Sequence, residues 1–354
     1  MSSTLPAGVV TGKHYQTLLQ SCKQDRYALP AINVVGTNSI NAVLEAAAKT
    51  KSDVIIQLSN GGAEFYAGKG APDSFRAKVL GAVSAAHHVH LMAKEYGVCV
   101  VLHTDHANKK LIPWVEAMIT HGEDYFKQHG TPLFSSHMID LSEEPLDENI
   151  HECARILKRL HAIDMSIEIE LGVTGGEEDG VGSDDIDNAK LYTQPEDVLK
   201  AYDTLLPLGH FSVAASFGNV HGVYSPGNVK LRPEILKHSQ ELIERTHKTG
   251  KNPLDLVFHG GSGSDKNQIT ETLDYGVFKM NIDTDTQFAF SNPIGDFVKA
   301  NAKAFAFQID PDTGKPYKKE YDPRGWLRIG EKGIVTRLEE AFSDLRSAGK
   351  SLAK

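Results

Sequence analysis

Short apolar segments alternate with segments of helical periodicity along the whole chain. Eight of the apolar segments are compatible with strands, at 28–33, 54–59, 98–103, 133–140, 166–172, 211–218, 255–260 and 276–283. Near-continuous apolar strands separated by helices are typical of a parallel sheet that is covered on its faces. Eight such βα units favour an α/β fold of the closed (β/α)8 barrel (TIM barrel) type over its rival, an open doubly wound sheet.

The segments between the strands carry helix signals. Residues 39–51 begin with a serine and are rich in alanine. Ser142 can cap a helix with an acidic first turn, and Thr193 with Glu196 resembles a capping box. Five apolar residues then give the first of these two helices one buried face: Leu146, Ile150, Cys153, Leu157 and Leu160. No linker or repeat divides the chain, which predicts a single barrel domain over 1–354 with extra helices and a long C-terminal extension.

Two segments depart from this regular alternation. Residues 172–190 are glycine-rich and acidic, which predicts a mobile loop after the fifth strand. Residues 291–325 are polar and predict a long extension after the eighth strand. Long loops in compact domains tend to be functional or disordered. Because both segments follow strands, we expect them on the face of the barrel where active sites lie.

Composition limits the classes of partner. The 354 residues carry a net charge of −9, with a sequence pI near 6.0, which argues against non-specific binding to nucleic acid or membranes. The three cysteines are widely spaced and odd in number, so they predict neither a disulfide framework nor a CxxC metal site. The chain begins with no signal-peptide pattern and contains no apolar run of ~20 residues, so we expect a cytoplasmic protein.

Three histidines directly follow the apolar cores of three separate strands. They are His106, His221 and His259. Imidazole suits zinc, and three protein ligands with one open position are typical of a catalytic zinc site. The cluster at 87–90 and His103 are interpreted as structural instead.

Acidic residues accompany these histidines. Asp105 can orient a metal ligand, transfer a proton or cap the next helix. Glu168 and Glu170 alternate along one strand and share a face, and Asp140 ends the strand before it. Asp140 and Glu170 can hold a second cation, or they are a helix cap and a member of a buried ion pair; both interpretations stay open at this point.

The segments HGGSGS (259–264) and NIDTDT (281–286) follow the last two strands. Glycines let backbone N–H groups approach an anion, and serine hydroxyls add donors. The loops after strands seven and eight of a barrel are a frequent phosphate site. The position of these segments therefore predicts a phosphate-binding pocket.

Several longer strings resemble one enzyme family. NVVGTNSINAVLEAA, HTDHANKK, EIELGVTGGEEDG, ASFGNVHGVY, VFHGGSGS, KMNIDTDTQ and YDPRGWLR are similar to the class II fructose-bisphosphate aldolases of the larger, class IIA branch. The likeness extends in order from about residue 10 to 345. It implies a zinc-dependent homodimer that reversibly cleaves fructose 1,6-bisphosphate into dihydroxyacetone phosphate and glyceraldehyde 3-phosphate.

The resemblance also implies roles for individual residues. His106, His221 and His259 match the ligands of the catalytic zinc, and Asp140 and Glu170 match a second metal position. Asp105 matches the residue that exchanges a proton with the C4 oxygen, and Glu178 matches the base that acts on the ketose carbon. Matches to the substrate contacts are Asn33, Ser59, Gly222, Gly260, Gly261, Ser262, Asn281, Ile282, Asp283, Thr284 and Arg324. A monovalent cation, Na⁺ or K⁺, is implied near the phosphate beside carbonyls of Val220, Gly222 and Gly260.

Three alternatives remain at this point. A Schiff-base aldolase would use Lys279 as its amine, but that mechanism leaves the three histidines unexplained. A tagatose-bisphosphate aldolase, or one for a related ketose bisphosphate, differs in substrate at one hydroxyl. A non-catalytic sugar-phosphate-binding protein would have no need of Asp105 and Glu178.

Overall fold

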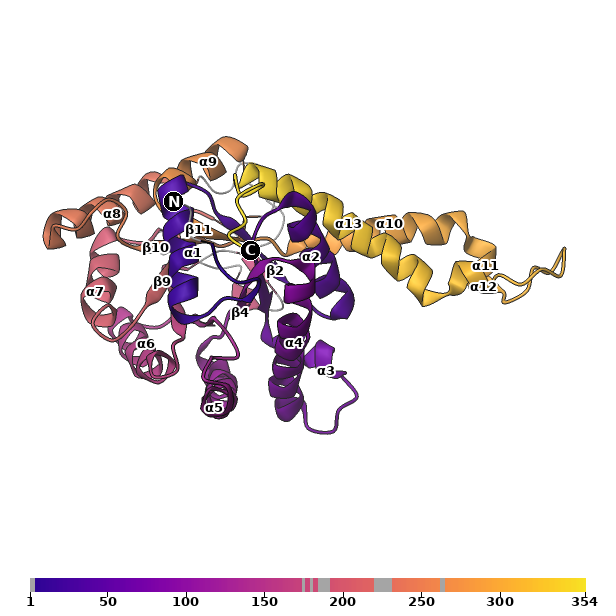
Figure 1. Ribbon diagram of the computed structural model, residues 1–354, viewed down its shortest axis with the longest axis horizontal. Coiled ribbons are helices and arrows are strands. Elements are labelled where there is room, and N and C mark those ends of the chain that lie inside the picture. Colours follow the sequence, from indigo (N-terminus) through magenta and orange to yellow (C-terminus); the bar gives the residue numbers. More distant parts are fainter. Residues whose placement is uncertain (1–3, 174–175, 179–180, 184–191, 220–230, 262–264) are drawn as a thin grey trace.

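The computed structural model describes residues 4–173, 176–178, 181–183, 192–219, 231–261 and 265–354. Eight parallel strands form a closed barrel at its centre (Figure 1). In chain order they are β2 (Leu29–Asn33), β3 (Val54–Leu58), β4 (Cys99–Thr104), β5 (Ser136–Ile139), β6 (Ser166–Leu171), β9 (Phe211–Ala215), β10 (Asp255–Phe258) and β11 (Val277–Asn281). Each strand pairs with the next, and β11 pairs with β2 to close the barrel. The eight predicted strands and the (β/α)8 fold are therefore confirmed.

Helices cover the barrel, the first of them at one end and the others around its outer face (Figure 1). They are α1 (Gly12–Asp25), α2 (Thr37–Thr50), α3 (Asn60–Ala67), α4 (Ser74–Tyr96), α5 (Ile112–His129), α6 (Leu146–His161), α7 (Pro195–Leu205), α8 (Glu234–His247) and α9 (Lys266–Asp274). A short 3-10 turn, η1 (Lys109–Leu111), precedes α5. No helix among these described segments or in the arm below is both long and apolar enough to span a bilayer. That the whole chain forms one domain stays a prediction.

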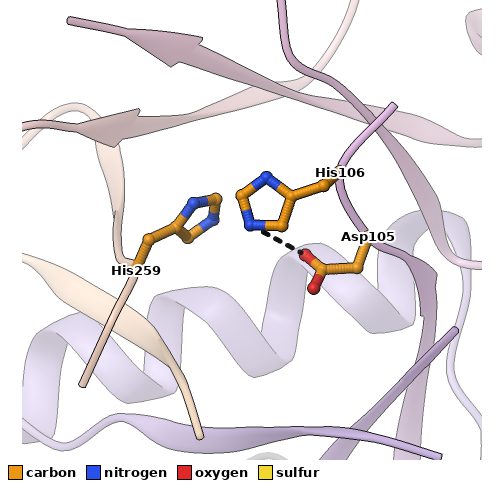
Figure 2. A group of neighbouring side chains, drawn as sticks. All are labelled: Asp105, His106 and His259. Atoms are coloured by element: carbon orange, nitrogen blue, oxygen red, sulfur yellow. Dashed lines mark ion pairs between the residues drawn. The ribbon is translucent and has the colours of Figure 1, made fainter. Parts of the chain in front are cut away.

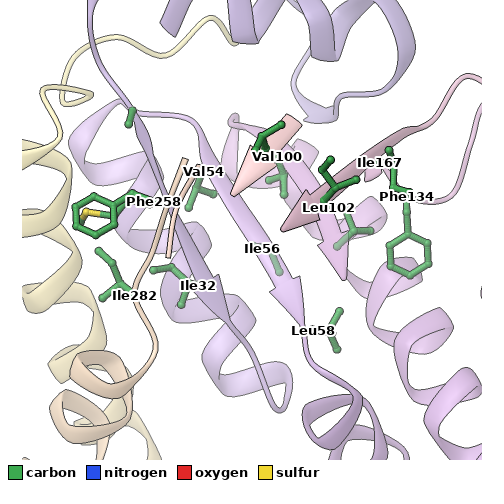
Figure 3. Close-up of a cluster of buried hydrophobic side chains, with 14 of the residues drawn as sticks. Ile32, Val54, Ile56, Leu58, Val100, Leu102, Phe134, Ile167, Phe258 and Ile282 are labelled. Atoms are coloured by element: carbon green, nitrogen blue, oxygen red, sulfur yellow. The ribbon is translucent and has the colours of Figure 1, made fainter. Parts of the chain in front are cut away.

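Two apolar clusters hold the barrel together. The larger lies between the strands and the outer helices and includes Ile32, Ile56 and Leu102 (Figure 3). The smaller joins α1 to residues such as Ile55 and Val101, which alternate with the first set along the same strands. Because side chains in a strand point alternately to its two faces, this second set belongs to the barrel interior. Apolar side chains thus fill the end of the barrel on which α1 packs.

Farther along the strands, the interior becomes polar. Ile55 is followed on the same face by Gln57, and Val101 is followed by His103 and then by Asp105. Glu168 and Glu170 share the interior face of β6, as the alternation predicted, and both are buried. The interior therefore changes from apolar to charged toward the carboxyl ends of the strands.

The structure corrects the two predicted helix caps. Pro145 occupies the N-cap position of α6, and Ser142 instead donates its hydroxyl to Asp140 over 2.6 Å. Before α7, Thr193 donates to the carbonyl of Leu171 and accepts from the backbone N–H of Ser216. The Ser142 hydroxyl thus holds the carboxylate that follows β5, and the Thr193 hydroxyl joins the ends of β6 and β9, so neither caps a helix. Four apolar residues of the predicted α6 face are buried as expected: Ile150, Cys153, Leu157 and Leu160.

Three short strands were not predicted. β1 (Gly8–Val9) pairs with the start of β4 outside the eight-stranded ring. Within the expected loop 172–190, β7 (Gly176–Glu178) and β8 (Val181–Ser183) form an antiparallel pair. Glycine and acidic residues conceal this pairing in the sequence, because they are depleted in strands.

The polar segment 291–325 is not the irregular extension that its composition suggested. Helix α10 (Thr284–Ala300), α11 (Ala302–Ala306), α12 (Lys318–Tyr321) and α13 (Pro323–Asp344) form an arm (Figure 1). The arm projects sideways from the barrel, with α11 and α12 at its far end, and α13 runs back toward the barrel. The segment thus begins beyond the carboxyl end of β11, and its helices lead away from the barrel (Figure 1).

Close approach of α10 and α13 requires glycine in the arm. A Cβ on Gly333 would lie 1.9 Å from the carbonyl oxygen of Ala289, and a Cβ on Gly330 would lie 2.7 Å from the Phe290 ring. The backbone of Ala289 cannot move aside as the end of a flexible side chain can. Only glycine at position 333 therefore allows the two helices to lie this close together.

We expect Gly333→Ala to lower the free energy of unfolding by about 1–3 kcal/mol, the usual cost of overpacking. Gly295→Ala is the matched control, since Gly295 lies in α10 and a methyl group added there would meet no atom of the described residues within 4 Å. That change should be neutral or raise stability by about 0.5–1 kcal/mol, because alanine favours helix. Urea unfolding of both variants measures the difference, and equal midpoints would contradict the tight contact.

Candidate metal centre and active site

Titratable side chains meet at the carboxyl ends of four strands of the barrel. Asp105 and His106 directly follow β4, Asp140 follows β5, Glu170 is the penultimate residue of β6, and His259 follows β10. In a closed parallel barrel these strand ends converge on one face, where the active sites of such folds lie. Four of the five are buried, and the Asp140 side chain is 15% exposed.

The backbone at His106 turns sharply. Its φ of +32° is rare for a residue with a side chain, and such conformations concentrate at functional sites. The turn brings His106 and Asp105 to the same side although they are adjacent in sequence, as the position at a strand end suggested. Figure 2 shows the His106 ring between His259 and Asp105, and the two imidazoles pack edge to face with centroids 4.7 Å apart.

Two overlapping groups could hold a metal ion among the described residues. One contains Asp105, His106 and His259, and the other contains His106, Asp140 and Glu170. His106 Nδ1 lies 3.6 Å from Asp140 Oδ2 and 3.8 Å from Glu170 Oε2, and His259 Nδ1 lies 3.2 Å from Glu170 Oε2. Tetrahedral zinc with ligands at 2.0–2.1 Å would place ligand atoms about 3.4 Å apart. The donor types and their spacing therefore fit zinc.

The charges of the group also fit a cation. Burial alone would raise the pKa of Asp140, but hydrogen bonds and charge from His106 and the Ser142 hydroxyl bring that pKa below its usual value. Burial would lower the pKa of His259, whereas the nearby carboxylates of Glu170 and Glu168 raise it to about 9. Metal-free His259 is thus an imidazolium held by two carboxylates, and a metal ion would take the place of its proton.

Three amides hold the carboxylate of Asp105. Asn33 and Gln57 donate to Oδ2 over 3.1 and 2.9 Å, and Asn281 donates to Oδ1 over 3.2 Å. Gln57 also donates to the Asn33 carbonyl over 2.5 Å. With β2, β3 and β11 each supplying a donor, Asp105 is fixed at the centre of the site rather than capping a helix.

Sequence reasoning did not select Gln57. The sequence signal was a single amide, Gln57, inside the apolar run VIIQLS. In the structure Gln57 is buried and shares the interior face of β3 with Ile55. A polar residue at an inward-facing position of an apolar strand is costly unless it is hydrogen-bonded.

The turns after β10 and β11 lie side by side. Gly260 has a φ of +62°, and the Gly261 N–H donates to the carbonyl of Asn281 over 3.1 Å. A Cβ on Gly261 would lie 2.6 Å from Met280 Cγ, so only glycine fits there. Ile282 is buried, Asp283 is the N-cap of α10, and Thr284 is its first residue. The N–H groups at a helix N-terminus favour anions, so the start of α10 is a candidate for the predicted phosphate pocket.

Asn33 ends β2 and Ser59 follows β3, so both lie on the same face as the metal-binding groups. The Ser59 hydroxyl accepts from the N–H of Gly62 over 3.0 Å and caps α3. This local role accounts for its conformation and leaves its expected contact to substrate as a proposal.

For several predicted residues the described part of the structure shows no contact with this group. His221, Gly222, Val220 and Ser262 lie outside the described residues. Glu178 ends β7, and only its backbone is described. Arg324 lies in α13, where its side chain is 89% exposed and pairs with Asp322 at 2.7 Å.

A charged pair lies beneath the metal-binding groups. Lys279 Nζ lies 2.9 and 2.8 Å from the two carboxylate oxygens of Glu168, and both side chains are buried. Glu168 thus engages the Lys279 amine from both carboxylate oxygens, and this contact gives no support to the Schiff-base alternative.

Known proteins show the same architecture and similar sequence. The family model described as "Fructose-bisphosphate aldolase class-II" matches residues 13–350. A fructose-bisphosphate aldolase of Campylobacter jejuni is 54% identical over 349 residues, with 98% of each chain covered, and class 2 fructose-bisphosphate aldolase of Escherichia coli K12 is 54% identical over 345 residues, with 96% of each covered. A crystal structure of the C. jejuni aldolase matches with a TM-score of 0.89 at 52% identity over 98% of each chain.

A parallel barrel with histidines and carboxylates gathered at the carboxyl ends of its strands has the architecture of a metal-dependent barrel enzyme. With the family match over nearly its whole length, the chain belongs to the class II fructose-bisphosphate aldolases. The resemblance stated from the sequence strings is thereby confirmed.

The raised pKa of His259 makes zinc binding pH-dependent. The protonated state stabilises the metal-free fold fully below the ordinary pKa near 6.5, and that contribution is lost as the pH rises through about 9. A ligand imidazole must be neutral, so at pH 7 we expect zinc binding to release about one proton from His259. Calorimetric titration in buffers of different ionisation enthalpy measures that proton. Identical observed enthalpies in all buffers would contradict the assignment.

Proposed function

We propose that the protein catalyses the reversible aldol cleavage of fructose 1,6-bisphosphate into dihydroxyacetone phosphate and glyceraldehyde 3-phosphate, with catalytic zinc. The observation that carries the proposal is the pair of overlapping groups around His106, within a family of fructose-bisphosphate aldolases. This reaction belongs to glycolysis and gluconeogenesis, and we place the protein in the cytoplasm.

His106 and His259, completed by His221, are the proposed ligands of the catalytic zinc. Asp140 and Glu170 are the proposed second metal position, and both carboxylates lie close to His106, which belongs to both groups. When bound, zinc supplies a Lewis acid that polarises the ketose carbonyl and stabilises the enediolate.

Asp105 is proposed to exchange a proton with the C4 oxygen as the C3–C4 bond breaks or forms. Its amide donors from Asn33, Gln57 and Asn281 hold the carboxylate in one orientation, which favours proton transfer at a single substrate atom. Glu178 is proposed as the base that removes the proton from the carbon beside the carbonyl. Glu178 belongs to the segment that follows β6.

The two phosphates are assigned to different elements. The ketose-side phosphate is proposed to bind backbone N–H groups of Gly260 to Ser262 and of Asn281 to Thr284 with Gly222, beside a monovalent cation. Support comes from the adjacent glycine turn and the start of α10. Asn33 is proposed to contact a substrate hydroxyl, and Ser59 the aldehyde-side phosphate.

Arg324 is the second proposed contact to the aldehyde-side phosphate. Its side chain is exposed on the arm, and α13 begins at the end of the arm remote from its own barrel (Figure 1). The contact therefore requires a second copy of the chain, which agrees with the proposed homodimer. Four exposed apolar residues on the arm also favour an interface: Phe288, Phe305, Phe307 and Ile309.

Two other functions are less well supported. A tagatose-bisphosphate or related ketose-bisphosphate aldolase would use the same metal group and would differ only where one substrate hydroxyl binds. A non-catalytic sugar-phosphate-binding protein would have no need to hold a buried carboxylate such as Asp105 with three amides. We propose no nucleic-acid or membrane partner, in agreement with the net charge of −9.

A coupled assay of bisphosphate cleavage tests the proposed function. We expect turnover of fructose 1,6-bisphosphate that is lost on chelation and returns with zinc or cobalt, because the carbonyl is polarised only when metal is present. Borohydride with triose phosphate should trap no adduct. Turnover that survives thorough chelation, or a preference for the tagatose substrate, would overturn the corresponding part of the proposal.

For Arg324→Ala we expect kcat/KM for the bisphosphate to fall by an amount equivalent to about 2–4 kcal/mol, because a charged phosphate loses its partner. Co-expression of the Arg324→Ala chain with an Asp105→Asn chain tests whether Arg324 acts on the site of its partner or on the site of its own chain. If Arg324 acts on the partner's site, a mixed dimer contains one site with both Asp105 and Arg324 and should regain activity. If Arg324 acts within its own chain, each site of the mixed dimer lacks one of the two residues and no activity returns. No regain in isolated mixed dimers would contradict the cross-subunit contact.

A further inference from the structure

Lys279 is a buried charge that the proposed reaction does not use. It lies on the interior face of β11, with 1% of the residue exposed, and its partner Glu168 on β6 is 2% exposed. Interior positions of parallel barrels are dominated by branched apolar residues, and replacing a buried ion pair by apolar residues is often neutral or stabilising. Stability alone therefore does not account for this pair.

The pair reaches the metal-binding group through one carboxylate oxygen. Glu168 Oε1 accepts from Lys279 Nζ over 2.9 Å and from His259 Nε2 over 2.8 Å. Since Nε2 carries the proton that it donates to Glu168, the electron pair of the neutral ring lies on Nδ1. Nδ1 is the atom that faces Glu170, 3.2 Å away, at the group with His106. The hydrogen bond thus selects the ring nitrogen that a metal would bind.

The other oxygen of Glu168 is held as well. Oε2 accepts from Lys279 Nζ over 2.8 Å and lies 3.4 Å from His103 Nε2, while His103 Nδ1 is hydrogen-bonded to the Ser136 hydroxyl at 2.7 Å. Strands β4, β5, β6 and β11 therefore fix the plane of this carboxylate from several sides. Lys279 is the one member of this set that contacts both oxygens.

We propose that Lys279 is a positioning residue for the metal ligand His259 and acts through Glu168. The lysine holds the carboxylate as the acceptor of the Nε2 proton, and the carboxylate in turn presents Nδ1 to the metal ion. This inference rests on the proposed function, because it assigns His259 to zinc. It gives Lys279 a part in metal binding without any contact to substrate.

Zinc affinity of Lys279→Met and Glu168→Gln, measured by competition with a chromophoric chelator, tests the inference. We expect each variant to bind zinc about 10–100-fold more weakly than the wild type, the usual effect of losing a partner of a metal ligand. In Glu168→Gln the single carbonyl pairs with Lys279, and the amide N–H₂ faces Nε2, which moves the ring proton to Nδ1. The visible spectrum of the cobalt-loaded variants should change with the ligand geometry, and Lys279→Arg should recover part of the affinity.

Lys23→Met is the matched control. Lys23 Nζ lies 2.8 Å from Asp255 in another largely buried pair, at the start of β10 rather than at its carboxyl end. This variant loses a comparable ion pair and should keep wild-type zinc affinity. If Lys279→Met fails to fold, the double variant Lys279→Met with Glu168→Gln leaves no unpaired charge, and it should fold and still bind zinc weakly.

The outcomes separate the inference from the proposed function. Variants that fold and bind zinc within twofold of the wild type, with an unchanged cobalt spectrum, would overturn the positioning role alone. A loss of affinity in Lys23→Met equal to that in Lys279→Met would also overturn it, since any lost ion pair would then suffice. A wild-type protein that cleaves the bisphosphate without zinc bound at His259 would overturn the proposed metal mechanism itself.

Discussion

Closure of the sheet between β11 and β2 is the constraint on which the site depends. An open sheet would leave β2 and β11 at opposite edges, whereas pairing of Lys279 with Leu29 and of Asn281 with Ala31 joins them. Only then do Asn33, Gln57 and Asn281 reach one carboxylate, that of Asp105. The same closure brings Lys279 on β11 to Glu168 on β6 across the interior. Residues more than 170 positions apart in sequence, such as Asp105 and Asn281, become neighbours by this one pairing.

Apolar packing at one end of the barrel offsets the free-energy cost of burying charged groups at the other end. Burying carboxylates, imidazoles and an ammonium group is costly, and each remains stable only with partners held in good geometry. The cluster that joins α1 to Ile55 and Val101 fills one end of the interior with apolar contacts. That packing keeps the strands in register, so the polar groups two and four residues farther along each strand meet their partners.

The sequence predicted the barrel closely because the barrel depends on local patterns. All eight strands were located within a few residues, and the positions of His106, Asp140, Glu170 and His259 at strand ends followed from the fold. The helix caps failed because both hydroxyls bond elsewhere: Ser142 donates to Asp140, two residues before it, and Thr193 donates to the end of β6, 22 residues away in sequence. The polar composition of 291–325 predicted the extension but concealed its helices, because α10 is largely exposed and α13 packs on both α10 and α2. The partners of Asp105 and of His259 depend on strand register across the barrel, which sequence spacing does not specify.

The period of two along a strand also explains why the site needs a polar layer beneath it. The inward-facing residues two positions before Asp105, Glu170 and Asn281 are His103, Glu168 and Lys279 respectively. Had these three been apolar, His259 Nε2 would be buried without an acceptor, and its ring would be free to present either nitrogen. A closed barrel thus orders its site in layers: apolar packing fixes the strands, the charged layer fixes the histidine, and the histidine faces the metal position.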